Sequence, residues 1–155
     1  MFQIARAEEH QIPAMAELWL EFMRFHQSIE PFFKPREGAV AGEKEQLRRV
    51  MKSEDGLVLV ATDGGRVVGF AHSEIRGPHK VYSMDRYGAL DTMAVTAEYR
   101  RKGVGEAMLR ETLDWFRSKN VDRVELEVLS RNDIGYSFWK KHGFTDYRHR
   151  LLLNI

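Results

Sequence analysis

The chain has 155 residues, long enough for one domain with a sizeable core, and its 43% hydrophobic and 30% charged residues are typical of a globular protein. With 24 Lys and Arg against 23 Asp and Glu, the net charge of +1 argues against a general attraction to nucleic acid. The absence of cysteine excludes disulfides, thiolate metal sites and a cysteine nucleophile. No apolar run approaches the ~20 residues that span a bilayer, and the N-terminus lacks a signal-peptide pattern. We therefore expect one cytoplasmic domain over residues 1–155, with neither a membrane nor a nucleic acid as partner.

The first third of the chain predicts a strand and two helices. Residues 2–7 favour an edge strand, and apolar residues recur every three or four positions over 13–29, as on one face of a helix. Pro31 and Pro35 end that helix, because proline disfavours helical backbone in the residue before it. Residues 40–52 have the period of a second amphipathic helix.

The rest of the chain alternates strands with helices. Two β-rich runs joined by Asp63-Gly64-Gly65 predict an antiparallel hairpin, and residues 90–95 form a further buried strand. The remaining predicted elements are a helix from residue 105, a strand over 121–129, a helix from 132 to 142 and a final strand over 144–155.

A basic turn that contains two glycines joins the strand at 90–95 to the helix that follows. Its cations are Arg100, Arg101 and Lys102, and its glycines are Gly103 and Gly105. The first amides of a helix lack partners within the helix and carry the positive end of its dipole, so they can hold a phosphate that glycine lets approach. On these residues alone, a solvated basic turn with glycines for tightness is an equally good interpretation.

The chain contains two short motifs at a fixed distance. The first is Arg100-x-x-Gly103-x-Gly105 after a strand, and the second is Asn132-x-x-Gly135-x-x-Phe138-Trp139-x-x-x-Gly143-Phe144. Together they resemble two motifs of the GNAT N-acetyltransferase superfamily. The first is similar to its acyl-CoA pyrophosphate loop, and the second to its later motif, which usually has Ala and Tyr where Gly135 and Trp139 stand.

The resemblance implies an α/β (α+β) fold. Its central sheet is mostly antiparallel, has about six strands, is splayed between the fourth and fifth, and is flanked by four helices. Only about a dozen residues follow the last predicted helix, where the family commonly has two strands. The final strand is then either single or completes its pairing through a second subunit, which would make the protein a homodimer.

The implied reaction is direct transfer of an acetyl group from acetyl-CoA, the cosubstrate, to a primary amine of a small molecule or peptide. The alternative is a catalytically weak or inactive acyl-CoA-binding regulator. The resemblance and the turn together assign the following residues to acetyl-CoA: Met93, Ala94, Val95, Arg100, Arg101, Lys102, Gly103, Val104, Gly105, Glu106, Asn132 and Trp139.

A carboxylate is needed to take a proton from the acceptor, because an amine with a pKa near ~10.4 is almost wholly protonated at neutral pH. Glu127 is the first candidate, since Leu126 to Asn132 resembles the stretch that carries the base in ribosomal-protein N-terminal acetyltransferases. Asp91 is the second, as a carboxylate inside an apolar strand. Each has a structural interpretation too, a solvated or salt-bridged residue for Glu127 and a hydrogen-bonded carboxylate for Asp91. His72 and Glu74 are further candidates, although such residues more often line a polar face.

The acceptor itself is not identified by the sequence. In the fold that the resemblance implies, the first two helices and their connection cover the acceptor site. The candidates for contact there are Phe25, His26, Glu30 and Phe33. No set of residues predicts a metal site.

Overall fold

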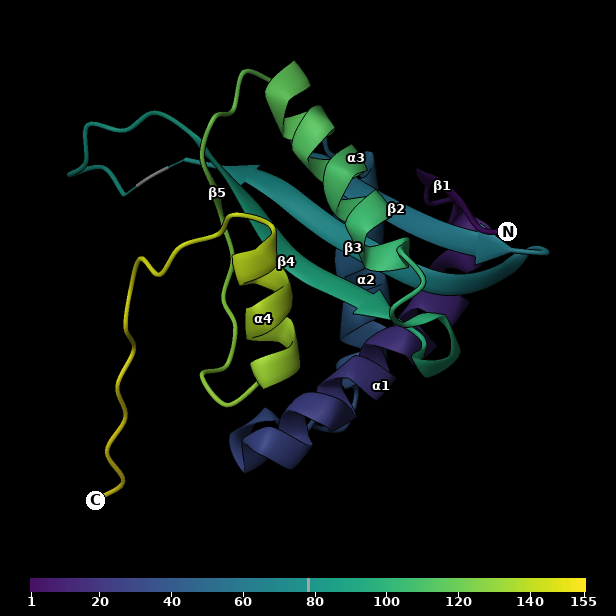
Figure 1. Ribbon diagram of the computed structural model, residues 1–155, viewed down its shortest axis with the longest axis horizontal. Helices are drawn as coiled ribbons and strands as arrows, with labels where there is room; N and C mark the ends of the chain where they lie inside the picture. The colour runs from purple at the N-terminus through teal and green to yellow at the C-terminus, as the bar shows by residue number, and fades with distance from the viewer. Residues whose placement is uncertain (78) are drawn as a thin grey trace.

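The computed structural model describes residues 1–77 and 79–155 (Figure 1). The strands are β1 (Gln3–Arg6), β2 (Gly56–Asp63), β3 (Arg66–Arg76), β4 (Tyr87–Val95) and β5 (Val124–Glu125). The helices are α1 (Ile12–Ile29), α2 (Ala39–Lys52), α3 (Val104–Ser118) and α4 (Asp133–Lys141). None of the helices in these ranges combines the length and the apolar composition needed to cross a lipid bilayer.

Over these described residues the strands form one sheet in the order β1-β2-β3-β4-β5. The first four pair antiparallel, whereas β4 and β5 are parallel. The β4–β5 pairing consists of Gly88 opposite Val124 and Ala89 opposite Glu125. Past Ala89 the two strands separate, so the sheet is splayed between the fourth and fifth strands, as the resemblance implies.

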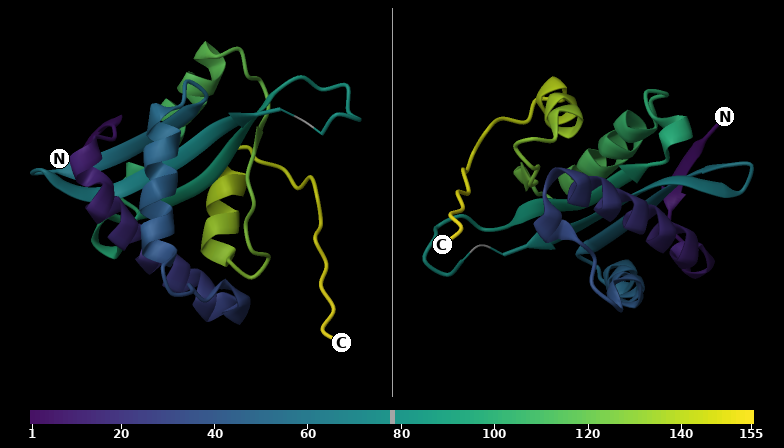
Figure 2. Two further views of the ribbon diagram at one scale, coloured as in Figure 1. Left: turned by 180° about the vertical axis from the view of Figure 1, so that it is seen from behind. Right: turned by 90° about the horizontal axis from the view of Figure 1, so that it is seen from below.

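Helices cover both faces of the sheet (Figure 2). On one face α3 packs Met108, Trp115 and Phe116 against β2 and β3. On the other face α1 and α2 pack against a second apolar cluster that includes Phe70 of β3. Helix α3, which follows the basic turn, and the helices predicted to cover the acceptor therefore lie on opposite faces of the sheet.

Most element boundaries follow the sequence pattern closely. The hairpin turn between β2 and β3 places Gly64 and Gly65 at φ of 56° and 82°, which glycine adopts without steric cost. The connection between α1 and α2 contains a short 3-10 turn, Pro31–Phe33, where the prolines end the first helix.

The strand predictions at the C-terminal end are wrong. The predicted strand over 121–129 is reduced to β5, and residues 144–155 make no strand, so the described sheet has five strands and not about six. A strand needs a neighbour to bond its backbone, and in the described part of the chain no strand pairs with residues 126–129 or 144–155. Beyond Glu125 the chain diverges from β4, and the last residues run away from the sheet (Figure 1).

Candidate active site

A β-bulge in β4 turns one carboxylate toward the α1/α2 face of the sheet. His72 pairs with Thr92 while the next residue, Ser73, pairs with Leu90, which leaves Asp91 as an extra residue in β4. The Asp91 carboxylate lies 2.8 Å from a guanidinium nitrogen of Arg76. Residues 70, 72, 74 and 76 of β3 share one face by alternation, and Phe70 places that face against α1 and α2.

The carboxylate belongs to a group of acidic residues and one histidine, which we call the acid cluster: Glu43, His72, Glu74 and Asp91. Arg76 bridges Glu74 and Asp91 at 3.0 and 2.8 Å. The His72 Nε2 atom lies 3.6 Å from a carboxylate oxygen of each of these two residues. From α2, Arg49 binds the other oxygen of Glu74 at 3.0 Å.

Burial sets the protonation of this cluster. Burial lowers the pKa of His72, against the opposing effect of the carboxylates, so the ring is neutral at pH 7. Burial raises the pKa of Asp91 above its ordinary range although His72 and Arg76 oppose the shift. Burial, then repulsion from Asp91, raises the pKa of Glu43 to about 7. Among the three carboxyls, the pKa of Glu74 alone is lowered, because hydrogen bonds from Arg76 and Arg49 outweigh its burial.

Three members of the cluster have the spacing of a metal site, since ligand atoms of His72, Glu74 and Asp91 all lie within 4.8 Å of one another. Arg76, however, already donates to the same oxygens of Glu74 and Asp91 that face the His72 ring. A guanidinium thus supplies the positive charge at this point, which favours a proton-transfer site over a cation site.

The basic turn opens toward the N-terminus of α3. Arg101 has φ of 59° and Gly103 has φ of 83°, which gives the turn its sharp path. The amide of Ala107 donates to the Gly103 carbonyl, so the amides of residues 104–106 precede the hydrogen bonding within the helix. A Cβ built on Gly105 would meet only the ring of Phe138, at 3.5 Å. The turn therefore fits an approaching phosphate.

The end of β4 lies between the turn and the acid cluster. Met93, Ala94 and Val95 pair with β3 on one side, and within the described residues no strand pairs with them on the other. Arg100 of the turn donates its Nε–H to the Val95 carbonyl at 3.2 Å, which ties the turn to this strand end. The open edge is where the sequence predicts main-chain donors for a thioester carbonyl.

The model of the acetyltransferase (GNAT) family matches residues 12–144, most of the chain. The chain belongs to the GNAT acetyltransferase family. A curated relative, the uncharacterized N-acetyltransferase YobR of Bacillus subtilis, is 32% identical over 62 residues, which are 40% of this chain and 25% of YobR. The chain thus aligns with about a quarter of that relative's length.

Solved structures confirm the GNAT fold. A tetramutant of the BH1408 protein of Bacillus halodurans superposes with a TM-score of 0.87 over 99% of both chains, at 16% identity. A predicted acetyltransferase of Clostridium acetobutylicum, solved with acetyl-CoA, superposes with a TM-score of 0.77 over 99% of this chain and 96% of that one, at 18% identity. GNAT acetyltransferases use acetyl-CoA as the acetyl donor, which is the cosubstrate expected from the turn.

Two residues of the second GNAT motif have clear structural roles in α4. The buried Asn132 side chain accepts a hydrogen bond from the Gly135 amide and caps the helix. Trp139 packs its ring edge-on against Phe138 and Phe144, with centroids 4.8 and 5.5 Å away.

The structure does not bring Glu127 into the acid cluster. This residue follows β5, its side chain is 85% exposed, and the ion-pair partner recorded for it among the described residues is Arg150, at 3.8 Å. Asp91, by contrast, is in direct contact with His72 and Arg76. Of the two predicted carboxylates, only Asp91 lies in the acid cluster.

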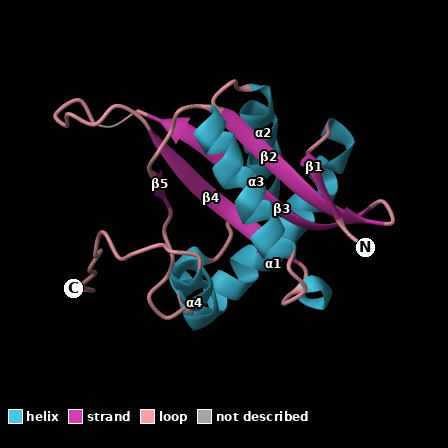
Figure 3. Cartoon of the chain, turned by 45° about the horizontal axis from the view of Figure 1, so that its top comes forward, coloured by secondary structure: helices cyan, strands magenta, loops and turns pink. Residues whose placement is uncertain are grey.

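The predicted acceptor contacts gather at the end of α1. The rings of Phe25 and Phe33 lie 5.5 and 6.4 Å from that of His26. Glu30 is engaged with Arg131 at 3.1 Å, which joins the end of α1 to the start of α4 (Figure 3). The negative charge of Glu30 is therefore balanced by Arg131 of the same chain.

The sequence analysis missed Glu43, Arg49 and Arg76 as members of this site. A signal for Glu43 was present, because it precedes the buried residues Leu47 and Val50 by four and seven positions on one face of α2. Arg76 follows Glu74 by two positions on one strand, so the two share a face.

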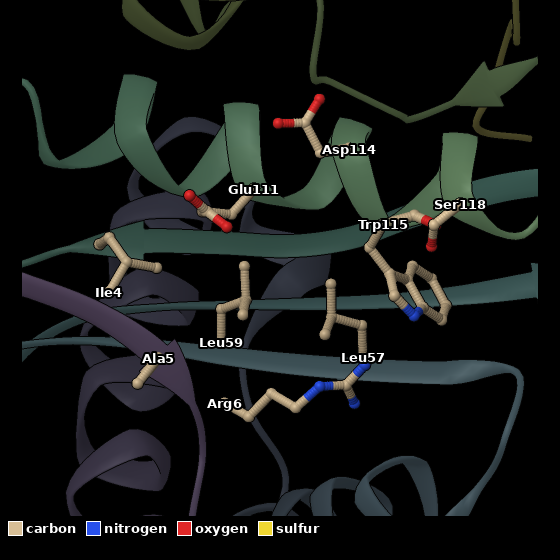
Figure 4. Close-up of a pocket in the computed structure, with 9 residues that line it drawn as sticks. All are labelled: Ile4, Ala5, Arg6, Leu57, Leu59, Glu111, Asp114, Trp115 and Ser118. Atoms are coloured by element: carbon tan, nitrogen blue, oxygen red, sulfur yellow. The ribbon is translucent and has the colours of Figure 1, made fainter.

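The structure also has a shallow hollow of about 320 Å³ between β1, β2 and α3 (Figure 4). Arg6, Glu111, Asp114 and Trp115 are among the residues that line it. None of its lining residues belongs to the acid cluster or the basic turn, so the hollow is separate from the candidate active site.

Proposed function

We propose that the protein is an acetyl-CoA-dependent N-acetyltransferase that moves an acetyl group directly onto a primary amine of a small molecule or peptide. The observation that carries this proposal is the position of the acid cluster beside the open edge of β4, on the face opposite α3. Acetyl-CoA at the α3 turn and an amine above the cluster can approach that edge from opposite faces.

In this reaction the amine nitrogen attacks the thioester carbonyl, a C–N bond forms and the C–S bond breaks. The ammonium proton passes first to a carboxylate, because only the neutral amine has a lone pair to donate. Asp91 is the base that we favour, since its burial raises its pKa toward the working pH. The Arg76 guanidinium holds that carboxylate in place at 2.8 Å, and the neutral His72 ring lies beside it at 3.6 Å.

Glu43 gives the same site a means of attracting the acceptor. Its Oε1 atom is buried without a hydrogen-bond partner among the described residues, and it repels Asp91. An ammonium placed between these two carboxyls would satisfy both. The acceptor ammonium thus supplies the positive charge that would offset the repulsion between Glu43 and Asp91.

The departing thiolate takes its proton from solvent. The indole N–H of Trp139 does not ionise in the useful range, and the Tyr136 hydroxyl is occupied by a 2.9 Å hydrogen bond to Asp146 that raises its pKa. Trp139→Phe and Tyr136→Phe should therefore each lower kcat by less than tenfold, or under about 1.4 kcal/mol of barrier. A hundredfold loss in Tyr136→Phe would assign the acid to that hydroxyl.

The proposal is tested by incubating the protein with acetyl-CoA and a panel of amines and peptides while free thiol is detected. Asp91→Asn should lower kcat at neutral pH and recover part of the rate at high pH, where more of the amine is already neutral. Glu127→Gln serves as the matched comparison. If the Glu127 variant loses rate in this pH-dependent way and the Asp91 variant does not, Glu127 is the base.

The second candidate function is an acyl-CoA-binding regulator without catalysis. Trp139 favours this candidate, because the family motif usually has a tyrosine at that position. Thermal shift with acetyl-CoA separates the two. Binding with no thiol release across the panel would support the regulator.

A further inference from the structure

The hollow between β1, β2 and α3 contains a buried hydrogen-bond donor that the fold does not use. The Trp115 side chain is among those that line the hollow, and the residue is only 8% exposed. Its indole Nε1 atom has no hydrogen-bond partner among the described residues. Folded proteins pair nearly all of their buried polar groups, so an unpaired one needs a specific explanation. An acceptor atom on a ligand in the hollow would provide the missing partner.

Strand β1 places a cation at the same end of the hollow. Ile4 packs against the core cluster under α3, and Arg6 lies two positions later, so both side chains are on that face of the strand. Arg6 pairs in register with Leu59 of β2, and its side chain extends toward Leu57 (Figure 4). The indole nitrogen of Trp115 lies on the ring edge that faces the same leucine (Figure 4). A guanidinium and an indole N–H at one place suit a carboxylate.

Helix α3 adds negative charge on the other side of the hollow. Glu111 and Asp114 both line it. Asp114 is already paired with Arg117 at 2.8 Å, whereas Glu111 and Arg6 form no ion pair with any residue that the structure describes. Glu111 lies four positions before Trp115, and Cβ atoms at this spacing on a helix are ~5–6 Å apart. A ligand with a cation close to its anion can therefore contact both ends.

The floor between these charges is apolar. Leu57 and Leu59 of β2 are both buried and contribute side chains to it, as does Ile4 of β1. The volume of about 320 Å³ is at the lower end of the ~300–1,000 Å³ that is usual for ligand pockets. The hollow thus fits a small molecule that combines both charges with an apolar group.

We propose that the hollow binds a free α-amino acid with an apolar side chain, at a site separate from the acceptor site. The carboxylate accepts hydrogen bonds from Arg6 and from the indole N–H of Trp115, the ammonium binds Glu111, and the side chain covers the two leucines. An α-amino acid carries both charges on one carbon, which matches the spacing of Glu111 and Trp115. A simple cation would leave the indole N–H without an acceptor, and a simple anion would be repelled by Glu111.

Calorimetric titration with L-leucine tests this proposal in the absence of acetyl-CoA. Leucine should bind at millimolar concentration or below. Leucinamide, which lacks the carboxylate, and isocaproate, which lacks the ammonium, should each bind about tenfold more weakly or worse, because each loses one of the two charged contacts. Equal affinity for leucine and either analogue would overturn the proposal, and so would the absence of binding by millimolar leucine.

Two variants of exposed residues assign the binding to the hollow. Arg6→Met and Glu111→Gln should each weaken leucine binding about tenfold or more, with an unchanged melting temperature, since both side chains are exposed. Arg110→Met is the matched control, because Arg110 is exposed on α3 and does not line the hollow. It should bind leucine as the wild type does. Wild-type affinity in Arg6→Met and Glu111→Gln would contradict the proposal.

The indole N–H resonance of Trp115 gives a readout that amino-acid binding at the acceptor site would not move. In isotopically labelled protein, leucine should shift this resonance downfield, because the N–H gains an acceptor. The indole resonances of Trp19 on α1 and Trp139 on α4 should stay in place. A shift of either of these with the Trp115 resonance unmoved would place the amino acid at another site and overturn the proposal.

Discussion

At the scale of single residues, the acid cluster lowers the stability of the fold, because it buries a carboxyl that we propose to bind the acceptor. Glu43 is partly buried with its pKa raised to about 7 from 4.5, and the described residues offer its buried Oε1 no hydrogen-bond donor. Below pH 4.5 the side chain is protonated in both the folded and unfolded states, so it contributes nothing to pH dependence. Between pH 4.5 and 7 the unfolded state loses its proton first, so the stability of the folded state falls as the pH rises.

We therefore predict that Glu43→Gln stabilises the protein at pH 8 but not at pH 4.5. The free energy of unfolding should rise by about 1–3 kcal/mol at pH 8. We expect the lower part of that range, because Glu43 is partly exposed and solvent screens its charge. Urea unfolding of both proteins at the two pH values measures it. An equal difference at both pH values would mean that the Glu43 charge is not the cause. The same variant should bind cationic acceptors less tightly, since it removes one of the two carboxyls proposed to hold the ammonium.

At the scale of elements, the β4–turn–α3 unit depends on two glycines for different reasons. A Cβ on Gly88 would lie 2.5 Å from the Phe116 ring, so this glycine lets β4 pack against α3. A Cβ on Gly105 would make only an ordinary contact at 3.5 Å with Phe138. A side chain at Gly105 is therefore tolerated by the protein alone, but it would clash with a pyrophosphate bound at the turn.

Gly105→Ala should thus lower acetyl-CoA affinity tenfold or more, about 1.4 kcal/mol, while the melting temperature stays unchanged or rises. Gly88→Ala should do the opposite, with a loss of about 1–3 kcal/mol of stability and wild-type affinity in the folded fraction. Calorimetric titration and thermal unfolding of the two variants compare these effects. Wild-type affinity in Gly105→Ala would place the pyrophosphate elsewhere.

At the scale of the whole molecule, the homodimer that the sequence leaves as one alternative would couple stability to protein concentration. A dimer that unfolds to two chains gains about 2.7 kcal/mol for each hundredfold rise in concentration. If the final residues complete their pairing through a second subunit, the melting temperature should therefore rise by several degrees over that range. Scanning calorimetry over a dilution series measures this, and a melting temperature independent of concentration would contradict the homodimer.

The sequence alone determined the family, the hairpin, the four helices and the basic turn. These depend on local signals, namely periodicity, glycines at positive φ and two motifs at fixed spacing, which neighbouring residues along the chain specify. The ends of α1, α2 and α4 accordingly lie within a residue or so of their predicted positions.

Only the tertiary structure decided which titratable groups meet. Asp91 reaches His72 because of a bulge that follows from the pairing of β3 with β4, and Glu43 joins them from a helix some fifty residues earlier in the chain. The strand predictions beyond Glu125 failed for a related reason. A strand exists only where another backbone bonds to it, and among the described residues no strand pairs with residues 126–129 or 144–155.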